Sequence, residues 1–158
     1  MKQWYTVKVK YTKEFEDGTL KRVTEPYLLS AVSFTDAETI IHKEVGETIR
    51  GEFTVTSIAV TEFADVFRYD DADVWYKCKV AYVSEDADSG KEKRIINNFL
   101  VSAHNVKEAY ERIDESLKGM MSTYETPIIA ETQIVEIFER EENLDVEISR
   151  TTVNNDIN

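Results

Sequence analysis

Cysteine, glycine and long apolar runs are all scarce in this chain of 158 residues, and each scarcity excludes a class of protein. The one cysteine, Cys78, excludes an internal disulfide and a CxxC motif, and its apolar neighbours predict a buried thiol in a reducing cytoplasm. The five glycines form neither a Walker nor a Rossmann spacing. No run approaches the roughly 18 apolar residues of a membrane-spanning helix.

Basic residues are also few, because 19 Lys and Arg stand against 31 Asp and Glu and give a net charge of −12. That charge opposes nonspecific binding to duplex DNA or to anionic membranes. The composition, 42% hydrophobic and 32% charged, is that of a globular protein. The chain enters a strand-like pattern directly after Met1, so we expect no signal peptide and a cytoplasmic location.

An internal repeat is the strongest pattern in the sequence. The segment Trp4–Tyr11 returns as Trp75–Tyr82, with Trp, Tyr, Lys, Val and Tyr at matching places. Offsets of 71 or 72 also align Leu28 with Leu100, and the offset changes only where loops tolerate insertions. The sequence therefore predicts a tandem duplication.

Each repeat reads as strand, strand, helix, strand. Alternating apolar and polar residues predict the first strand, and Asp17-Gly18 predicts a hairpin turn after it. Ser33 and Asn105 are predicted helix caps. The predicted strands are residues 4–11, 21–31, 53–67, 75–82, 93–103 and 124–138, and the predicted apolar helix faces are Phe34, Ala37, Ile41 and Val45, then Val106, Ala109, Ile113 and Leu117.

The predicted fold class is therefore α+β, with two tandem β-β-α-β repeats packed about a pseudo-twofold axis and a mainly antiparallel sheet. We assign residues 1–67 and 75–138 to the repeats, 68–74 to an acidic linker and 139–158 to a polar acidic tail. The alternative is two independent domains joined by that linker. Pro26 and Pro127 predict edge or bulged strand positions, because proline donates no hydrogen bond.

The motif Trp-Tyr-x-x-Lys-Val-x-Tyr, with Glu25-Pro26-Tyr27-Leu28 and Ser33–Glu38, resembles a family of short Bacteroidetes proteins. The segments Gly51–Thr56, Trp75–Val80 and Lys118–Met121 resemble the same family. The resemblance extends to about Phe138. It implies an origin in Bacteroidetes, their phages or mobile elements, and it implies no mechanism, because this is a domain of unknown function.

One face of the first strand of each repeat carries aromatic and basic residues together. Such interleaving suits single-stranded DNA or RNA, since bases stack on rings and ammonium groups meet phosphates. The predicted nucleic-acid-binding residues are Trp4, Lys8, Lys10, Trp75, Lys77 and Lys79. The alternative is that the Trp rings pack at the repeat interface while the lysines are simply solvated.

A second functional hypothesis uses the acidity. An acidic chain suits a protein-binding adaptor, or an inhibitor that imitates nucleic acid. Homo-oligomerisation through sheet edges is a third hypothesis. We predict no enzyme, cofactor or metal site: His42 and His104 are not at equivalent positions, and Asp70–Asp73 lacks the glycine and glutamate spacing of an EF-hand.

Overall fold

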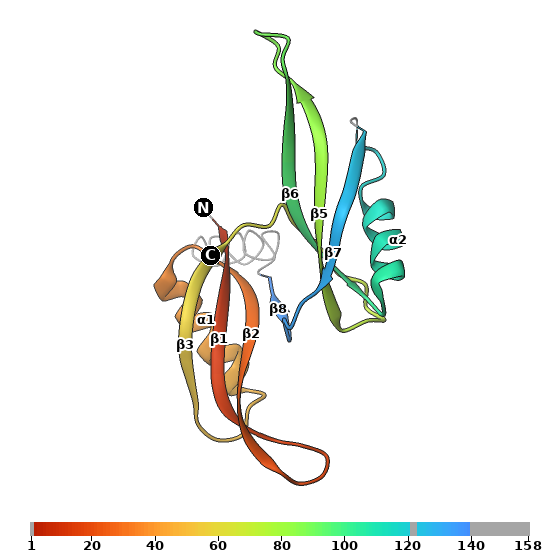
Figure 1. Cartoon of the computed structure of the whole chain (residues 1–158). Helices are drawn as coiled ribbons and strands as arrows, with labels where there is room; N and C mark the ends of the chain where they lie inside the picture. Colours follow the sequence, from red (N-terminus) through yellow and green to blue (C-terminus); the bar gives the residue numbers. More distant parts are fainter. Residues whose placement is uncertain (1, 121–122, 140–158) are drawn as a thin grey trace, which may run out of the picture.

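The computed structural model describes residues 2–120 and 123–139, and it confirms the α+β class. Each repeat contributes two long strands, a helix, a third strand and a short fourth strand (Figure 1). The first repeat comprises β1 (Gln3–Glu14), β2 (Leu20–Ala31), α1 (Phe34–Gly46), β3 (Phe53–Thr61) and β4 (Asp65–Phe67). The second comprises β5 (Val74–Glu85), β6 (Glu92–Ala103), α2 (Val106–Ser116), β7 (Tyr124–Glu131) and β8 (Ile137–Phe138).

Two four-stranded sheets carry the structure, with strand orders β3-β1-β2-β8 and β4-β6-β5-β7. The two hairpins have matching registers, from Gln3 opposite Ala31 in one and from Val74 opposite Ala103 in the other. Gly18 adopts the positive φ of 83° that its turn requires. A helix covers one face of each sheet, and we refer to the opposite face as the helix-free face (Figure 1).

The end of each repeat differs from the prediction, because residues 53–67 and 124–138 each form two strands instead of one. The pairing of β3 with β1 ends at Thr61, opposite Trp4 near the start of β1. Having no further partner there, the chain crosses to the other sheet, where β4 pairs in parallel with β6. In the same way β8 of the second repeat pairs in parallel with β2. The two repeats therefore exchange their last strands reciprocally.

The helix starts are as predicted, while the first residue of each predicted apolar face is not buried. Ser33 accepts a hydrogen bond from the amide of Asp36 at 3.0 Å, and Asn105 accepts one from Glu108 at 2.8 Å. Phe34 and Val106 occupy the first helical position and are 53% and 51% exposed, although the Phe34 ring lies edge-on to Tyr5 of β1 at 5.1 Å between centroids. The remaining apolar positions are buried or half-buried against the sheets.

Three apolar clusters form the core. Two lie between a helix and its sheet, and the second of these contains Cys78, which is fully buried as predicted. The third cluster, which we call the interface cluster, joins the helix-free faces of the two sheets. It consists of Leu28, Trp75, Leu100 and Ile137, with Trp4, Phe63, Val66 and Ile134 packed around them.

Pro127 lies in an edge strand, as predicted, whereas Pro26 lies in an inner strand of its sheet. The ladder of β8 covers Leu28 and Leu29, and just before it the Val135 amide donates to the Pro26 carbonyl at 3.0 Å. Pro127 lies in the edge strand β7, where the register against β5 shifts between Lys79 and Ala81. Pro127 therefore spares an amide that the edge strand does not need.

Candidate binding surfaces

The two predicted stacking residues lie together in the interface cluster. Trp75 is 2% exposed, and the guanidinium of Arg68 lies 5.1 Å from the centroid of its ring. Trp4 is half-buried in the same cluster. Burial therefore leaves the ring of Trp75 no free face on which a base could stack, while Trp4 retains partial exposure.

The four predicted lysines lie on the helix-free faces, as the strand alternation predicted. Lys8, Lys10 and Lys77 are exposed, and Lys79 is half-buried. The first two belong to β1 and the others to β5, so the structure divides them between two sheets (Figure 1). The two tryptophans therefore lie in one cluster, whereas the lysines lie on two different sheets.

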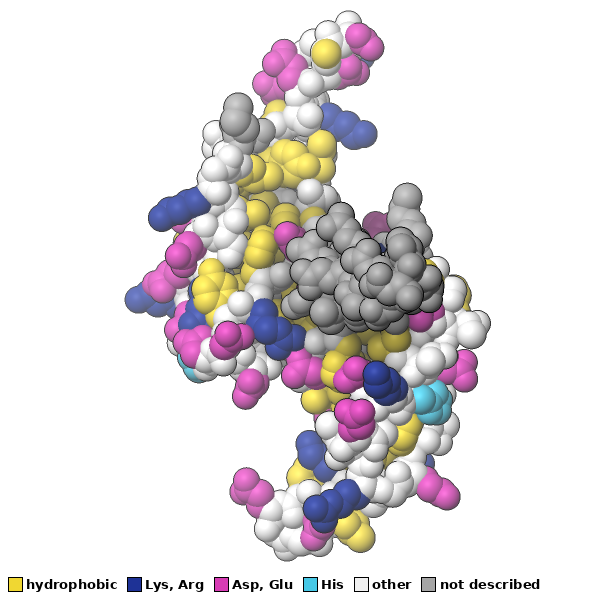
Figure 2. Space-filling model, turned by 180° about the vertical axis from the view of Figure 1, so that it is seen from behind, with side chains coloured by type: hydrophobic (Ala, Val, Ile, Leu, Met, Phe, Trp, Pro, Cys, Tyr) yellow, Lys and Arg dark blue, Asp and Glu magenta, His cyan; other side chains and the backbone are white. Residues whose placement is uncertain are grey.

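The helix-free face of the second sheet carries an exposed hydrophobic patch that we call the apolar face. It consists of Val83, Ile96 and Ile128, with the buried Ala81 among them. Val83, Ile96 and Ile128 are each 50% exposed. Ala81 lies directly opposite Ile96, and Ile128 lies opposite Lys79, so these side chains are cross-strand or diagonal neighbours. Figure 2 shows hydrophobic side chains gathered over the half that carries β5 and β6.

The first repeat has no such patch. The positions equivalent to Ala81, Val83, Ile96 and Ile128 are Lys10, Thr12, Thr24 and Ser57. All four of these are polar, and all four are exposed. We did not predict the apolar face, although a residue-by-residue comparison of the two repeats would have indicated it.

A cavity of about 370 Å³ adjoins the apolar face near the far end of β5. Ala81 and Val83 line it, together with Arg94 and Glu125. Arg94 lies directly opposite Val83, and Lys79 lies opposite Ile128. Two cations, Lys79 and Arg94, therefore lie beside the apolar face, and one carboxylate, Glu125, lies at the cavity.

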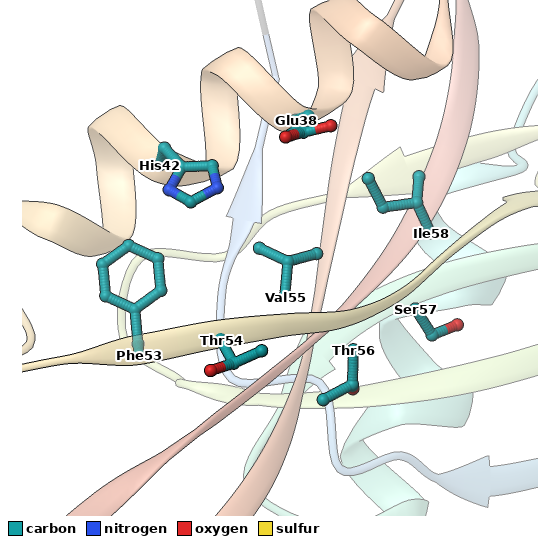
Figure 3. A pocket seen from close by; sticks show the side chains of 8 residues that line it. All are labelled: Glu38, His42, Phe53, Thr54, Val55, Thr56, Ser57 and Ile58. Atoms are coloured by element: carbon teal, nitrogen blue, oxygen red, sulfur yellow. The ribbon is translucent and has the colours of Figure 1, made fainter.

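A second cavity, of about 430 Å³, lies between α1 and β3 (Figure 3). Glu38 and His42 line it from the helix, and the strand segment 53–58 lines it from below. Phe53, Val55 and Ile58 point toward the helix in this view. The His42 ring lies 5.2 Å from the Phe53 ring, measured between centroids. The side chain of His42 is exposed.

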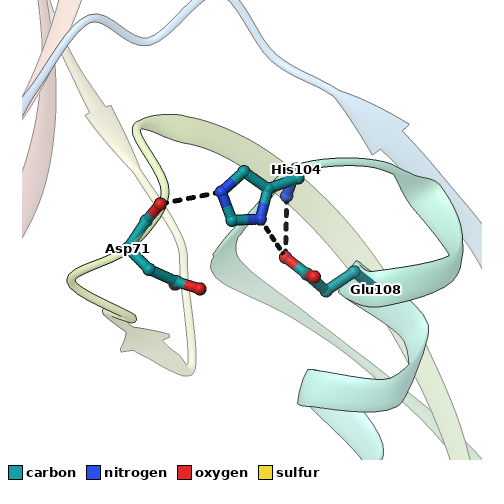
Figure 4. A group of neighbouring side chains, drawn as sticks. All are labelled: Asp71, His104 and Glu108. Atoms are coloured by element: carbon teal, nitrogen blue, oxygen red, sulfur yellow. Dashed lines mark hydrogen bonds and ion pairs between the residues drawn. The ribbon is translucent and has the colours of Figure 1, made fainter.

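The acidic linker is held against the second repeat by hydrogen bonds. The Tyr69 amide donates to Ser102 Oγ at 2.7 Å, and the Ser102 hydroxyl donates to the Tyr69 carbonyl at 3.0 Å. His104 Nε2 lies 2.7 Å from the Asp71 carbonyl, and its Nδ1 lies 2.7 Å from Glu108 Oε1 (Figure 4). The segment that the sequence presented as a linker is therefore anchored.

The carboxylates near His104 are already paired with neighbouring cations. Asp71, His104 and Glu108 have ligand atoms within 4.8 Å of one another, which is the spacing of a metal site. However, Arg112 donates to Asp71 at 2.7 Å and lies 3.1 Å from Glu108. Both ring nitrogens of His104 face oxygen acceptors, first Glu108 and then the Asp71 carbonyl, and these contacts raise the pKa of His104. The hydrogen bond from Arg112 lowers the pKa of Asp71, and the His104 amide lowers that of Glu108. We interpret the cluster as a charged latch and assign it no metal.

Cys78 has no suitable environment for nucleophilic chemistry. Its side chain is fully buried, and burial raises the pKa of its thiol to about 11. At neutral pH the thiol is therefore protonated, whereas the thiolate is the reactive form.

The family model described as "Domain of unknown function (DUF4494)" matches residues 3–140. The chain belongs to this family. The match spans both repeats and both exchanged strands, so the family domain is the duplicated unit as a whole. No curated protein and no solved structure matches the chain significantly. None of the helices in the described part of the chain has the length and apolar character needed to cross a bilayer.

Proposed function

We propose that this DUF4494 protein is a non-enzymatic, cytoplasmic protein-binding module that docks a partner on the apolar face. The exposure of Val83, Ile96 and Ile128 carries the proposal, because a partner that covers them removes three half-exposed aliphatic side chains from water. Complete burial of one such side chain contributes about 1.5–3 kcal/mol, and half of that remains available here.

The charges beside the apolar face define the kind of partner. Lys79 and Arg94 lie at ladder positions next to Ile128 and Val83 and outnumber the one carboxylate at the cavity, Glu125. A partner surface with an apolar centre and flanking carboxylates is therefore complementary. The binding partner is thus an acidic, partly apolar protein surface. The resemblance to Bacteroidetes proteins and their mobile elements favours a bacterial or phage protein as the source of that surface.

Site-specific photo-crosslinking tests this proposal with a control that the repeat itself supplies. A photoreactive phenylalanine analogue replaces Ile96 in one protein and the equivalent Thr24 in another, and both are irradiated in lysate of a Bacteroidetes host. We expect a discrete crosslinked protein at position 96, and none at position 24. Val83→Thr combined with Ile128→Ser should remove that product. Equal products at both positions, or a product that survives the double substitution, would refute the proposal.

Single-stranded nucleic acid remains a second candidate ligand, and the exposure of Lys8, Lys10 and Lys77 favours it. Because Trp75 is buried, binding would quench the half-buried Trp4 selectively. Titration of wild-type protein and of Trp4→Phe with a short oligonucleotide at low salt separates the two rings. Quenching in the wild type that disappears in Trp4→Phe supports this candidate, and unchanged emission in both proteins excludes it.

A further inference from the structure

The edge strand β3 lacks the features that usually protect a free sheet edge. Among the described residues it pairs only with β1, and its sequence, Phe-Thr-Val-Thr-Ser-Ile-Ala-Val-Thr, contains no proline and no charged residue over 9 residues. Such a strand has high β propensity and presents unpaired backbone groups along its outer edge. Proteins normally interrupt edges of this kind with proline, charge or shortness.

The other sheet edges of the described chain have those protections. β7, the repeat equivalent of β3, carries Pro127 at its centre and the charged residues Glu125 and Glu131. β4 and β8 are only 3 and 2 residues long. The second repeat therefore blocks the edge that the first repeat leaves open.

The cavity of about 430 Å³ beside β3 adds a site for a side chain. Its lining includes the apolar Phe53, Val55 and Ile58 below, and Glu38 and His42 from α1 above (Figure 3). Alternate side chains of a strand added at this edge would point into the space beneath α1. In strand addition, backbone hydrogen bonds supply affinity, and such cavities supply specificity.

Charge at the ends of β3 selects among possible occupants. Glu52 and Glu62 immediately flank the strand, and both are exposed. Antiparallel pairing of β3 with a second copy, centred on Ser57, would place each glutamate opposite the other copy's glutamate. Like charges directly opposite are destabilising. A strand with basic residues at its ends instead forms two opposite-charge pairs.

We propose that β3 accepts an extended segment of another polypeptide, with basic residues flanking a β-branched core, as an added fifth strand of the first sheet. This site is separate from the apolar face, which belongs to the second sheet and favours an acidic surface. The two sites together give the protein two docking surfaces of opposite charge preference, and the β3 proposal holds whether or not the apolar face binds a partner.

The test uses the eleven-residue peptide acetyl-Lys-Thr-Val-Thr-Val-Ile-Val-Thr-Val-Thr-Lys-amide as a probe, whose lysines are spaced to lie opposite Glu52 and Glu62, with backbone amide chemical shifts as the readout. We expect saturable shifts confined to β3, β1 and the exposed face of α1. A peptide with Glu in place of both Lys should bind at least tenfold more weakly. A peptide with proline in place of the central Ile should not bind, because it lacks a central amide donor.

Thr56→Pro is the matched protein variant, because Pro127 already occupies the equivalent position of β7. Thr56 has no Cα partner in β1, since the register passes from Ser57 opposite Lys8 to Val55 opposite Val9. Thr56→Pro also removes the hydrogen bond from Thr56 Oγ1 to the Lys8 carbonyl at 3.3 Å, so circular dichroism first checks that the sheet is intact. In the folded variant we expect binding to weaken at least tenfold. Ser57→Lys, which places a repelling charge on the exposed edge, is an independent second variant with the same expected result.

Three outcomes would overturn the proposal: no shifts in β3 at millimolar peptide, equal binding of the Lys and Glu peptides, or equal binding by wild type and both variants. Sedimentation of the protein without peptide tests whether a second copy of the chain occupies the β3 edge. A dimer that Thr56→Pro dissociates would assign the edge to a second copy and refute the proposed partner.

Discussion

Leu28 of the first repeat pairs with Ile137 of the second, and their repeat equivalents, Leu100 and Val66, form the same pair in the other sheet. Leu28, Leu100 and Ile137 are all buried in the interface cluster. Each repeat thus completes the other's sheet, and the contact that joins the halves is also the contact that buries Trp75. The duplication produced one interlocked unit with two different helix-free faces.

Truncation of Leu28 should destabilise both repeats together. Leu28 is fully buried, and Leu→Ala substitutions at such sites typically lower the free energy of unfolding by about 2–5 kcal/mol. We expect Leu28→Ala to lower the denaturant midpoint in a single transition. Leu20→Ala, at a position that is 67% exposed, should change the stability by less than about 0.5 kcal/mol. Two separate transitions in the Leu28 variant would show that the repeats unfold independently.

The interlocking strands were the part of the fold that the sequence could not supply. The hairpins, the caps at Ser33 and Asn105 and the buried helix positions are local patterns, and they were predicted. β4 and β8 are too short to carry a periodic signal, and their partners lie in the other repeat, so the sequence presented them as continuations of β3 and β7. The sequence also placed the Trp and Lys residues on one face of their strands correctly. Strand periodicity, however, does not indicate which part of that face is covered by a second sheet.

The latch at His104 should make stability depend on pH in a defined window. Its raised pKa means that the contribution of His104 is complete below the ordinary histidine value of 6.5 and is lost as pH rises through the folded-state pKa. The lowered pKa values of Asp71 and Glu108 mean that their contributions are lost as pH falls below the ordinary values of 3.8 and 4.5. The latch is therefore strongest between about 4.5 and 6.5.

NMR titration of the His104 ring measures this directly, together with denaturant midpoints at pH 5.5 and 8.5. We expect a pKa above 6.5 for His104 and a modest loss of stability at the higher pH. His104→Gln should abolish the pH-dependent part attributable to the latch. A His104 pKa at or below the ordinary value would contradict the charged arrangement.

The thiol of Cys78 should be unreactive in the folded protein. It is fully buried, and its pKa of about 11 leaves little thiolate at pH 8. We expect a disulfide reagent to modify it only as fast as the protein opens, and promptly after denaturation. Stoichiometric labelling within seconds under native conditions would show that the second core is not closed.

Fluorescence should distinguish the two tryptophans. In Trp4→Phe the emission comes from Trp75 alone, which is 2% exposed, so we expect a blue-shifted maximum and weak quenching by acrylamide. In Trp75→Phe the remaining Trp4 should be quenched more readily, because it is half-buried. Comparable quenching of both single-tryptophan proteins would argue against the interface cluster.

Exchange of surface residues between the repeats tests the central functional claim most directly. The substitutions Val83→Thr, Ile96→Thr and Ile128→Ser give the second sheet the residues of the first, and Thr12→Val, Thr24→Ile and Ser57→Ile do the reverse. The partner is first identified by crosslinking at position 96. The readout is then how much of that partner each variant, without a crosslinker, retains in a pull-down at equal concentration. We predict at least a tenfold loss in the first variant and additional binding in the second, whereas undiminished retention by the first variant would contradict the assignment of the apolar face.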